Sequence, residues 1–457
     1  MSEIHAVILA AGKGTRMRSQ RPKVLHEVAG RPMLAHVIDA AQAAGVQQAH
    51  VVVGHGADQV RQWAHAAGLA LTFAEQREQL GTAHAVAQAL PGIPDQARVW
   101  VLYGDVPLVD ARTLEALART PADGVALVTA RLTQPRGYGR ILRDAAGQVV
   151  GIVEENDASP EQRALTEINT GILAAPAGRL RQWLARVRND NAKGEYYLTD
   201  VIGLAVAEGV AVQAVLAAEA QDLEGVNDRA QLARAERRYQ QRQAQTLLDA
   251  GLTLADPARF DLRGELRHGQ DVFIDVGVVL EGRVVLGDGV RIGPYAQLRD
   301  VVLGERCEVL AHSVLEGVRA GTAVRVGPFA RLRPGTELAD EVHIGNFVEV
   351  KQARLGTGTK AGHLAYLGDA VIGAEVNVSA GVITCNYDGA NKHLTTIGDG
   401  AFIGSDSQLV APVTVGARAF IAAGSTITRE APADQLTIAR HRGQTSLAGW
   451  KRPTKKR

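Results

Sequence analysis

The second half of the chain repeats its hydrophobic positions every six residues, starting near Leu262 and ending at Ile427, with a slip of one residue before Leu303. Many of these aliphatic residues are followed by glycine or alanine, as in Ile344-Gly345. A period of six fits neither an α-helix nor an alternating strand, but it is typical of a parallel β-helix, in which each hexad forms one flat face of a prism. One aliphatic side chain per hexad then fills the axis, and small residues permit the corners. The repeat is carried by Ile274, Leu280, Leu286, Ile292, Leu298, Leu303, Val309, Leu315, Val326, Leu332, Leu338, Ile344, Val350, Ile372, Val378, Ile397, Ile403, Leu409, Val415, Ile421 and Ile427.

A β-sandwich of short strands is the alternative interpretation of this region, but such strands do not keep one phase over so many repeats. The phase breaks at residues 384–393, where an insertion precedes Ile397 and the repeat then resumes. Such an insertion is either a tolerated surface loop or a loop that serves a binding site, and the pattern alone leaves both open.

The first half of the chain alternates between strand-like and helical segments. Its first segment, Ala6–Ala11, is uniformly apolar and predicts a buried parallel strand. The alternation that follows predicts an α/β doubly wound sheet with a ligand site at the carboxyl ends of its strands. The further predicted strands are Ala49–Val53, Val99–Tyr103 and Val125–Thr129, and the predicted helices are Met33–Ala44, Thr82–Leu90 and Ala111–Arg119.

A long helix is predicted over Asp228–Ala250, because Asp228 can cap its start with Gln231 reaching back, and Gly251 can end it. This helix is the natural connector between the two halves. We therefore predict an α/β domain over residues 1–227, a linker helix over 228–251, and a β-helix domain with a C-terminal tail over 252–457.

The charge balance excludes a general attraction to nucleic acid or to membranes, since 50 Lys and Arg residues against 49 Asp and Glu residues leave a net charge of +1. Only Lys451–Arg457 is strongly basic, and we expect it to be a solvated terminus rather than a segment that acts near an anionic ligand. Two cysteines, Cys307 and Cys385, cannot form a disulfide framework. The lack of a signal peptide and of a long apolar run predicts a cytoplasmic protein without membrane insertion.

A glycine-rich loop, Gly12–Met17, follows the first predicted strand. It lacks the third glycine of a dinucleotide-binding loop and the Gly-Lys-Ser/Thr end of a Walker loop. A glycine turn after a buried strand can place backbone N–H groups around phosphates, although a purely structural turn has the same pattern. Arg16 and Lys23 add cations suited to a phosphoryl group.

The segment Leu9–Met17, followed by Pro22-Lys23, resembles the signature of sugar-1-phosphate nucleotidylyltransferases. With the hexad repeat, later blocks narrow the resemblance to the bifunctional N-acetylglucosamine-1-phosphate uridylyltransferases and glucosamine-1-phosphate N-acetyltransferases. It covers nearly the whole chain and implies a Rossmann-like domain, a linker helix and a left-handed parallel β-helix of hexapeptide repeats. Two of the blocks are Gln79–Ala83, which resembles the family's uracil-reading loop, and Tyr103–Pro107, which resembles its metal-binding strand end. The blocks that resemble its sugar pocket and second metal ligand are Gly137–Arg140, Val153-Glu154, Ile168–Gly171, Gly194–Tyr197 and Gly225–Asn227.

For the first domain, the resemblance implies transfer of UMP from UTP to N-acetylglucosamine-1-phosphate, with pyrophosphate as the leaving group. Arg16 and Lys23 are then expected to be catalytic by neutralising charge. Asp105 and Asn227 are expected to bind Mg²⁺, which keeps several waters and bridges substrate phosphates; a strand-end turn residue and a helix-entry residue are their alternative interpretations. The residues expected to bind UDP-N-acetylglucosamine are Leu9, Ala10, Ala11, Gly12, Lys23, Gln76, Gly81, Thr82, Tyr103, Gly104, Asp105, Gly139, Glu154, Asn169 and Asn227.

Polar residues interrupt the hexads in one region of the repeat, and a β-helix can stack such residues into one pocket. Arg333 and Lys351 suit a sugar phosphate, and His363 could accept a proton from an attacking amine, with Glu349 orienting or polarising it. Each could also be an ordinary surface residue. The resemblance implies an acetyltransferase site with His363 as its base. The residues expected to bind glucosamine-1-phosphate are Arg333, Lys351, Tyr366, Asn377, Asn386 and Tyr387.

The resemblance further implies that acetyl-CoA is the acetyl donor and that small residues let its pantetheine arm lie close to the prism. Cys385 could instead be a thiol acyl carrier, but no paired base is evident near it. The positions expected to contact acetyl-CoA are Ala380, Asn386, Tyr387, Ser405, Ala423 and Arg440.

The chain is thus expected to be a bifunctional enzyme that makes UDP-N-acetylglucosamine for peptidoglycan and, where present, lipopolysaccharide. The resemblance also implies a homotrimer assembled through the β-helix. One rival is a nucleotidylyltransferase whose β-helix is only structural or allosteric, and the Arg333, Lys351 and His363 cluster argues against it. Another is a non-enzymatic binding protein, against which the intact Lys23 and Asp105 argue.

Overall fold

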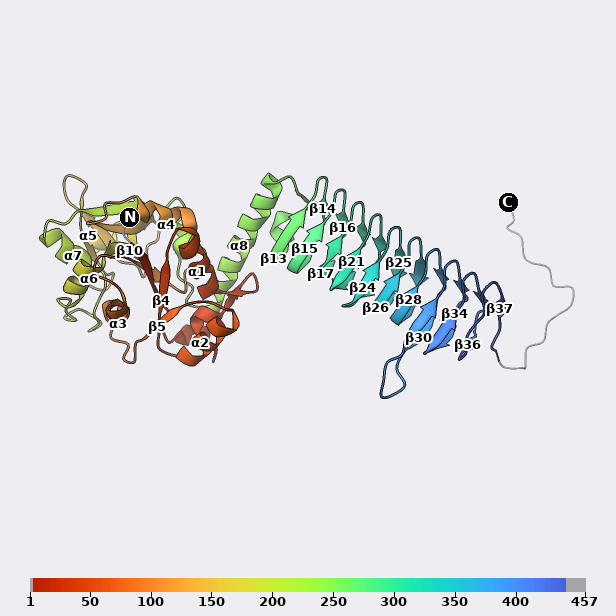
Figure 1. The fold of residues 1–457 in the computed structure, drawn as a ribbon. Helices are drawn as coiled ribbons and strands as arrows, with labels where there is room; N and C mark the ends of the chain where they lie inside the picture. The colour runs from red at the N-terminus through yellow and green to blue at the C-terminus, as the bar shows by residue number, and fades with distance from the viewer. Residues whose placement is uncertain (1–2, 441–457) are drawn as a thin grey trace. The chain divides into compact units, whose positions relative to one another are not determined.

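The structure is a computed structural model that describes residues 3–440 (Figure 1). The chain divides into two compact units between Tyr239 and Gln240. The basic segment Lys451–Arg457 lies outside the described residues. None of the helices within 3–440 combines the length and the apolar character needed to cross a lipid bilayer.

The first unit is built on a nine-stranded sheet. β1 (Ile4–Leu9) pairs in parallel with β4 (Gln48–Val53) and β6 (Arg98–Tyr103), which confirms the predicted strands there. β10 (Glu167–Pro176) instead runs antiparallel to β6 and to β7 (Val125–Arg131). The strand order is β11-β7-β10-β6-β1-β4-β5, with β11 (Val212–Leu216) and β5 (Thr72–Glu75) at the edges.

The antiparallel strand departs from the parallel sheet that the alternating pattern led us to expect. Between β7 and β10 the chain forms a hairpin, β8 (Arg140–Arg143) and β9 (Val149–Val153), and a four-residue helix, α5 (Pro160–Arg163). A parallel return needs a crossover that covers the sheet, usually through a longer helix. This segment provides none, so β10 returns antiparallel. β8 then pairs with Ile168, near the start of β10, and this pairing brings the hairpin to the carboxyl end of β7.

Helices cover both faces of this sheet (Figure 1). Ile8 of β1 packs into one core cluster and its neighbour Val7 into the other, and both are fully buried. This two-sided burial explains why the strand is apolar throughout. One face is covered by α1 (Met33–Ala43), α2 (Ala57–Ala66) and α4 (Ala111–Ala118), and the other by α3 (Thr82–Ala89), α6 (Ala177–Leu184) and α7 (Asp200–Ala207).

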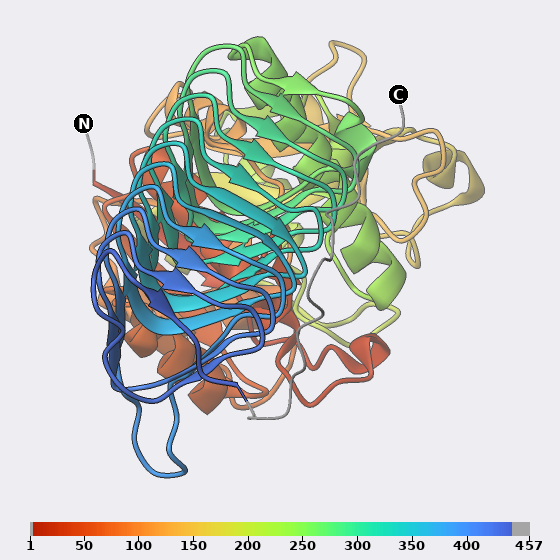
Figure 2. The ribbon, with the colours of Figure 1, turned by 90° about the vertical axis from the view of Figure 1, so that its right-hand side faces the viewer.

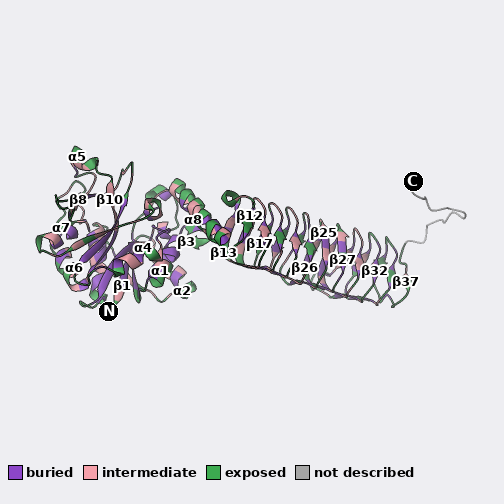
Figure 3. Cartoon of the chain, turned by 90° about the horizontal axis from the view of Figure 1, so that it is seen from above, coloured by how far each residue is buried: buried purple, intermediate pink, exposed green. Residues whose placement is uncertain are grey.

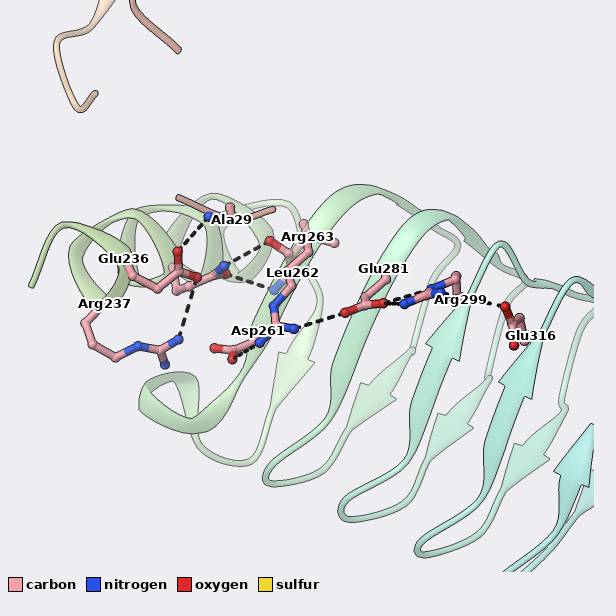
Figure 4. Close-up of polar contacts among 10 residues, drawn as sticks. Ala29, Glu236, Arg237, Asp261, Leu262, Arg263, Glu281, Arg299 and Glu316 are labelled. Carbon is pink, nitrogen blue, oxygen red and sulfur yellow. Dashed lines mark hydrogen bonds and ion pairs between the residues drawn. The ribbon is translucent and has the colours of Figure 1, made fainter. Parts of the chain in front are cut away.

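The helix α8 (Arg229–Asp249) forms where capping residues predicted it. The Asp228 side chain accepts a hydrogen bond from the Gln231 backbone N–H at 2.8 Å. In the first unit, the Glu236 carboxylate accepts a hydrogen bond from the Ala29 backbone N–H (Figure 4). In the second unit, the buried Gln240 side chain pairs with both backbone groups of Leu262. Gln240 therefore satisfies the backbone groups of Leu262 in β13 (Asp261–His268), the first strand of the 15-stranded sheet.

The second unit is a left-handed parallel β-helix whose coils form an 11-stranded and a 15-stranded sheet (Figure 2). Successive coils stack in register, as in Ile274 beside Ile292 and Val326 beside Ile344. Every aliphatic residue of the six-residue repeat named above is buried, with 4% exposure or less. This confirms the predicted inward column. Buried residues likewise follow the sheet of the first unit (Figure 3).

Candidate active sites

The glycine-rich loop and the carboxyl ends of β1 and β6 enclose a cavity of about 230 Å³. The Gly104 backbone N–H donates to the Leu9 carbonyl, which joins the two strand ends. Most residues expected to bind the nucleotide line this cavity. They are Leu9, Ala10, Ala11, Gly12, Lys23, Gln76, Gly81, Thr82, Tyr103 and Asp105.

Three side chains from distant segments converge beside this cavity. Lys23 lies in the 3-10 helix η2 (Lys23–Leu25), Asp105 follows β6, and Asn227 precedes α8. The Lys23 ammonium group donates to the Asp105 carboxylate and, at 3.2 Å, to the Asn227 amide oxygen. Two oxygen ligands thus face one cationic position, and hard oxygen donors are the ligands that Mg²⁺ prefers. The pair fits a magnesium ion that takes its other ligands from substrate and water.

A second cavity, of about 150 Å³, shares Thr82, Tyr103 and Glu195 with the first. Glu154 and Asn169 line it, as expected for the sugar pocket. The Asn169 backbone N–H donates to the Gly139 carbonyl, and a Cβ at Gly139 would lie 3.4 Å from the Glu154 carboxylate. The three residues expected to contact the sugar are therefore neighbours.

Burial controls the electrostatics of the sugar pocket. It raises the pKa of Glu154, although a hydrogen bond from the Thr199 hydroxyl opposes this shift. Burial also raises the pKa of Tyr103 and raises that of Tyr197 to about 12, with nearby carboxylates adding to both shifts. Both phenols therefore stay neutral near pH 7 and can donate hydrogen bonds to a sugar.

Some residues near these cavities were outside the expected set. Gln79 donates a hydrogen bond to the Ala11 carbonyl at 2.8 Å and lines the nucleotide cavity. Lys193 and Glu195 line the sugar cavity. Gln79 and Glu195 belong to blocks of the resemblance and Lys193 adjoins one, but only the fold reveals which side chains face inward. Arg16 lies in the 3-10 helix η1 (Thr15–Met17) and is exposed.

In the second unit, four expected site residues gather on the 15-stranded sheet. Arg333 follows β23 (Arg331–Leu332), Glu349 and Lys351 belong to β26 (Glu349–Leu355), and Tyr366 begins β28 (Tyr366–Ile372). The Arg333 guanidinium donates to the Glu349 carboxylate at 2.8 Å. Lys392, from the insertion, lies against Lys351 and, together with Arg333, lowers the pKa of Lys351. Three cations close together mark an anion site.

His363 and Asn377 belong to the 11-stranded sheet, on β27 (Lys360–His363) and β29 (Asn377–Val378). His363 lies in register with Asn346, at the end of β25 (His343–Asn346). The His363 Nδ1 atom is 2.7 Å from the Asn346 side-chain oxygen. Asn346 therefore contacts the expected base, whereas Glu349 contacts Arg333. Asn346 precedes His363 by 17 residues, which is one coil of the β-helix, and this spacing is the sequence signal that could have identified it.

The insertion partly folds back on the β-helix. Asn386 is buried, and its amide group donates to the Asp369 carboxylate and, at 3.4 Å, to the Tyr366 hydroxyl. Tyr387 is 60% exposed. The Ala380 carbonyl accepts the Asp406 N–H, and the Ser405 carbonyl accepts the Gly424 N–H. Ala380, Ser405 and Ala423 therefore lie on successive coils. They form a line of small residues, and Arg440 is exposed at the end of the described chain.

Within residues 3–440, no group of three His, Cys, Asp or Glu side chains could hold a metal ion by itself.

Residues 6–169 match the family model described as the MobA-like NTP transferase domain. Residues 394–429 match the bacterial transferase hexapeptide repeat. An α/β nucleotidyl-transfer unit followed by a hexapeptide-repeat transferase unit defines a two-activity transferase.

Curated relatives identify the particular family. The chain is 59% identical to the bifunctional protein GlmU of Alkalilimnicola ehrlichii over 98% of this chain and 96% of the relative. It is 57% identical to the bifunctional protein GlmU of Stenotrophomonas maltophilia, over 99% of both chains. The same identity holds for that of Bordetella parapertussis, over 99% of this chain and all of the relative. The chain belongs to the GlmU family of bifunctional uridylyltransferases and acetyltransferases of UDP-N-acetylglucosamine synthesis.

Proposed function

We propose that the two cavities of the first unit join UTP to N-acetylglucosamine-1-phosphate, and that the β-helix acetylates glucosamine-1-phosphate with acetyl-CoA. The observation that carries this proposal is that one chain holds two such groups of side chains. Lys23 contacts Asp105 and Asn227 in the first unit, and cationic side chains cluster around Lys351 in the second. A structural β-helix needs no such cluster, whereas a sugar phosphate does.

In uridylyl transfer, a phosphate oxygen of the sugar phosphate attacks the α-phosphorus of UTP, and pyrophosphate leaves. Backbone N–H groups of the loop at Gly12, with Lys23 and Arg16, neutralise the phosphates. Asp105 and Asn227 would hold Mg²⁺, which when bound neutralises phosphate charge. Gly139, Glu154 and Asn169 orient the sugar, so that catalysis rests on positioning and charge rather than on a covalent intermediate.

In acetyl transfer, the amine of glucosamine-1-phosphate attacks the thioester carbonyl, the C–S bond breaks, and the coenzyme leaves as a thiol. Arg333 and Lys351 hold the sugar phosphate, with Tyr366, Asn377, Asn386 and Tyr387 as further contacts. His363 accepts the proton of the amine through Nε2, because Nδ1 faces the Asn346 oxygen. The pantetheine arm follows Ala380, Ser405 and Ala423, and Arg440 contacts the coenzyme.

The functional protein is proposed to be a homotrimer. Arg333 and Lys351 lie on the 15-stranded sheet, and His363 lies on the 11-stranded sheet. These faces of the prism meet at a convex corner, so their side chains point away from each other. A neighbouring β-helix would close the groove between them. Support also comes from a stack of exposed rings along one corner, Tyr295, His312, Phe329 and Phe347, with centroids 5.0 to 5.6 Å apart. Light scattering should give three times the mass of one chain; a monomer would contradict the trimer.

The first experiment is thiol release from acetyl-CoA in the presence of glucosamine-1-phosphate, with the wild type and His363→Ala. Pyrophosphate release from UTP and N-acetylglucosamine-1-phosphate is measured in the same preparations. Release of thiol that collapses in the variant, with pyrophosphate release unchanged, supports both sites. A wild type that releases pyrophosphate but no thiol would reduce the β-helix to a scaffold.

A further inference from the structure

Arg140 is the most buried arginine among the described residues of the first unit, with 2% exposure against 4% for Arg98. It begins β8, beside the sugar pocket, and only 2% of its side chain is exposed. A guanidinium group keeps its charge at all accessible pH values, so its burial is tolerated only where acceptors surround it. Its acceptors therefore indicate what the residue holds in place.

The acceptors of Arg140 lie on three separate segments. One Nη atom donates to the Tyr138 carbonyl in the loop before β8. The other Nη atom contacts the Glu155 carboxylate at 3.4 Å and the Arg163 carbonyl at 3.3 Å, and Nε also donates to Arg163 at 3.3 Å. Glu155 follows β9, and Arg163 ends α5. One planar group therefore joins a loop, a strand end and a helix end.

Two of these acceptors, Tyr138 and Glu155, adjoin residues that are expected to bind the sugar. Gly139 lies between Tyr138 and Arg140, and its carbonyl accepts the Asn169 N–H at 2.9 Å. Glu154 immediately precedes Glu155. The strand that ends just before Glu154, β9, pairs with Arg140 at Val153. The Glu155 carboxylate also accepts the Gly137 backbone N–H at 2.6 Å. The contacts thus set the spacing between the glycine loop and the Glu154 carboxylate.

We infer that Arg140 is a positioning residue for the sugar: it holds Gly139, Glu154 and Asn169 in the binding arrangement before the substrate arrives. This inference rests on the proposed uridylyl transfer. The nucleotide cavity is formed mainly by segments that Arg140 does not contact, around Gly12, Gln76 and Asp105. Loss of Arg140 therefore weakens sugar binding selectively. A lysine does not replace it, because one ammonium group cannot reach acceptors in three directions.

The test uses the full chain with Arg140→Ala and with the charge-retaining variant Arg140→Lys. We expect the KM for N-acetylglucosamine-1-phosphate to rise about tenfold or more, because displacement of a positioned group by about 1 Å can cost up to about 100-fold. The KM for UTP should change by less than about twofold. Methylguanidinium added to Arg140→Ala should lower the sugar KM again, which a purely structural defect would not allow.

Arg143→Ala is the matched control, since Arg143 lies on the same strand but pairs with Glu167 at the surface. It should leave the sugar KM unchanged. Acetyl transfer by the second unit of each variant reports that the chain has folded. An Arg140→Ala protein with the wild-type sugar KM, or with equal losses for sugar and UTP, would overturn the inference. If the wild type itself fails to release pyrophosphate, the proposed function fails instead.

Discussion

The His363 Nδ1 atom lies 2.7 Å from the side-chain oxygen of Asn346, one coil earlier in the β-helix. An amide oxygen only accepts hydrogen bonds, so Nδ1 carries the proton and Nε2 is left as the basic atom. The stacking of coils, rather than closeness in the chain, produces this arrangement. The hydrogen bond to Asn346 therefore gives the exposed His363 side chain a defined tautomer and ring orientation.

Asn346→Ala should therefore lower kcat for acetyl transfer by about 10- to 100-fold, because the imidazole loses both orientation and tautomer preference. Asn346→Asp should keep most of the activity, since a carboxylate accepts the same bond, and should move the acid limb of the pH–rate profile to higher pH. Thiol release measures both. Full activity of Asn346→Ala would remove Asn346 from the mechanism.

Asp105→Ala should abolish most uridylyl transfer, by about 100-fold or more, because it removes the only carboxylate of the proposed magnesium pair. Titration with Mn²⁺ in the presence of UTP should show weaker metal binding. Acetyl transfer, measured on the same protein, should be unaffected. An Asp105→Ala protein that retains full uridylyl transfer would contradict the metal assignment.

Two glycines on neighbouring coils offer a test of how closely the prism is packed. A Cβ at Gly345 would lie 1.8 Å from the Gly362 carbonyl oxygen, whereas a Cβ at Gly362 would meet nothing within 4 Å. Gly345→Ala should destabilise the β-helix by at least about 2 kcal/mol, because the clash is with backbone that cannot move alone. Gly362→Ala should leave thermal unfolding nearly unchanged. Equal stability of the two variants would contradict the packing described here.

The pH dependence of stability should reveal Asp200, at the start of α7. Burial raises the pKa of Asp200 to about 6, with Glu154 and other carboxylates adding to the shift. The native state therefore favours the protonated form, and its stability falls as the pH rises from about 4 through about 6. Because the carboxyl is half-exposed, the loss should be about 1 kcal/mol, well below what the full shift implies.

Asp200→Asn removes this titration. It should equal the wild type near pH 4 and be more stable at pH 8, as measured by denaturant unfolding of the first unit. Asp58→Asn is the control, because Asp58 also lies in the first turn of a helix but is 88% exposed. If the stability of Asp200→Asn depends on pH in the same way as that of the wild type, the raised pKa of Asp200 is wrong.

The sequence alone was sufficient to predict the structure wherever an element follows a local pattern of residues. The six-residue period predicted the inward column from Ile274 to Ile427, and all of those side chains are buried. Capping residues predicted α8, and uniformly apolar runs predicted β1 and β6. In each case burial acts on side chains that are close in the chain, so the pattern carries the information.

The tertiary structure alone decided the features that depend on distant segments. The direction of β10 followed from the lack of a covering crossover after β7. The contacts of Lys23 with Asp105 and Asn227, of Asn346 with His363, and of Arg140 with Arg163 join residues from separate elements. Motifs pointed to several of these residues, but not to their partners. A side chain's partner depends on strand order, register and burial, which are set by the packing of the whole unit and not by local spacing.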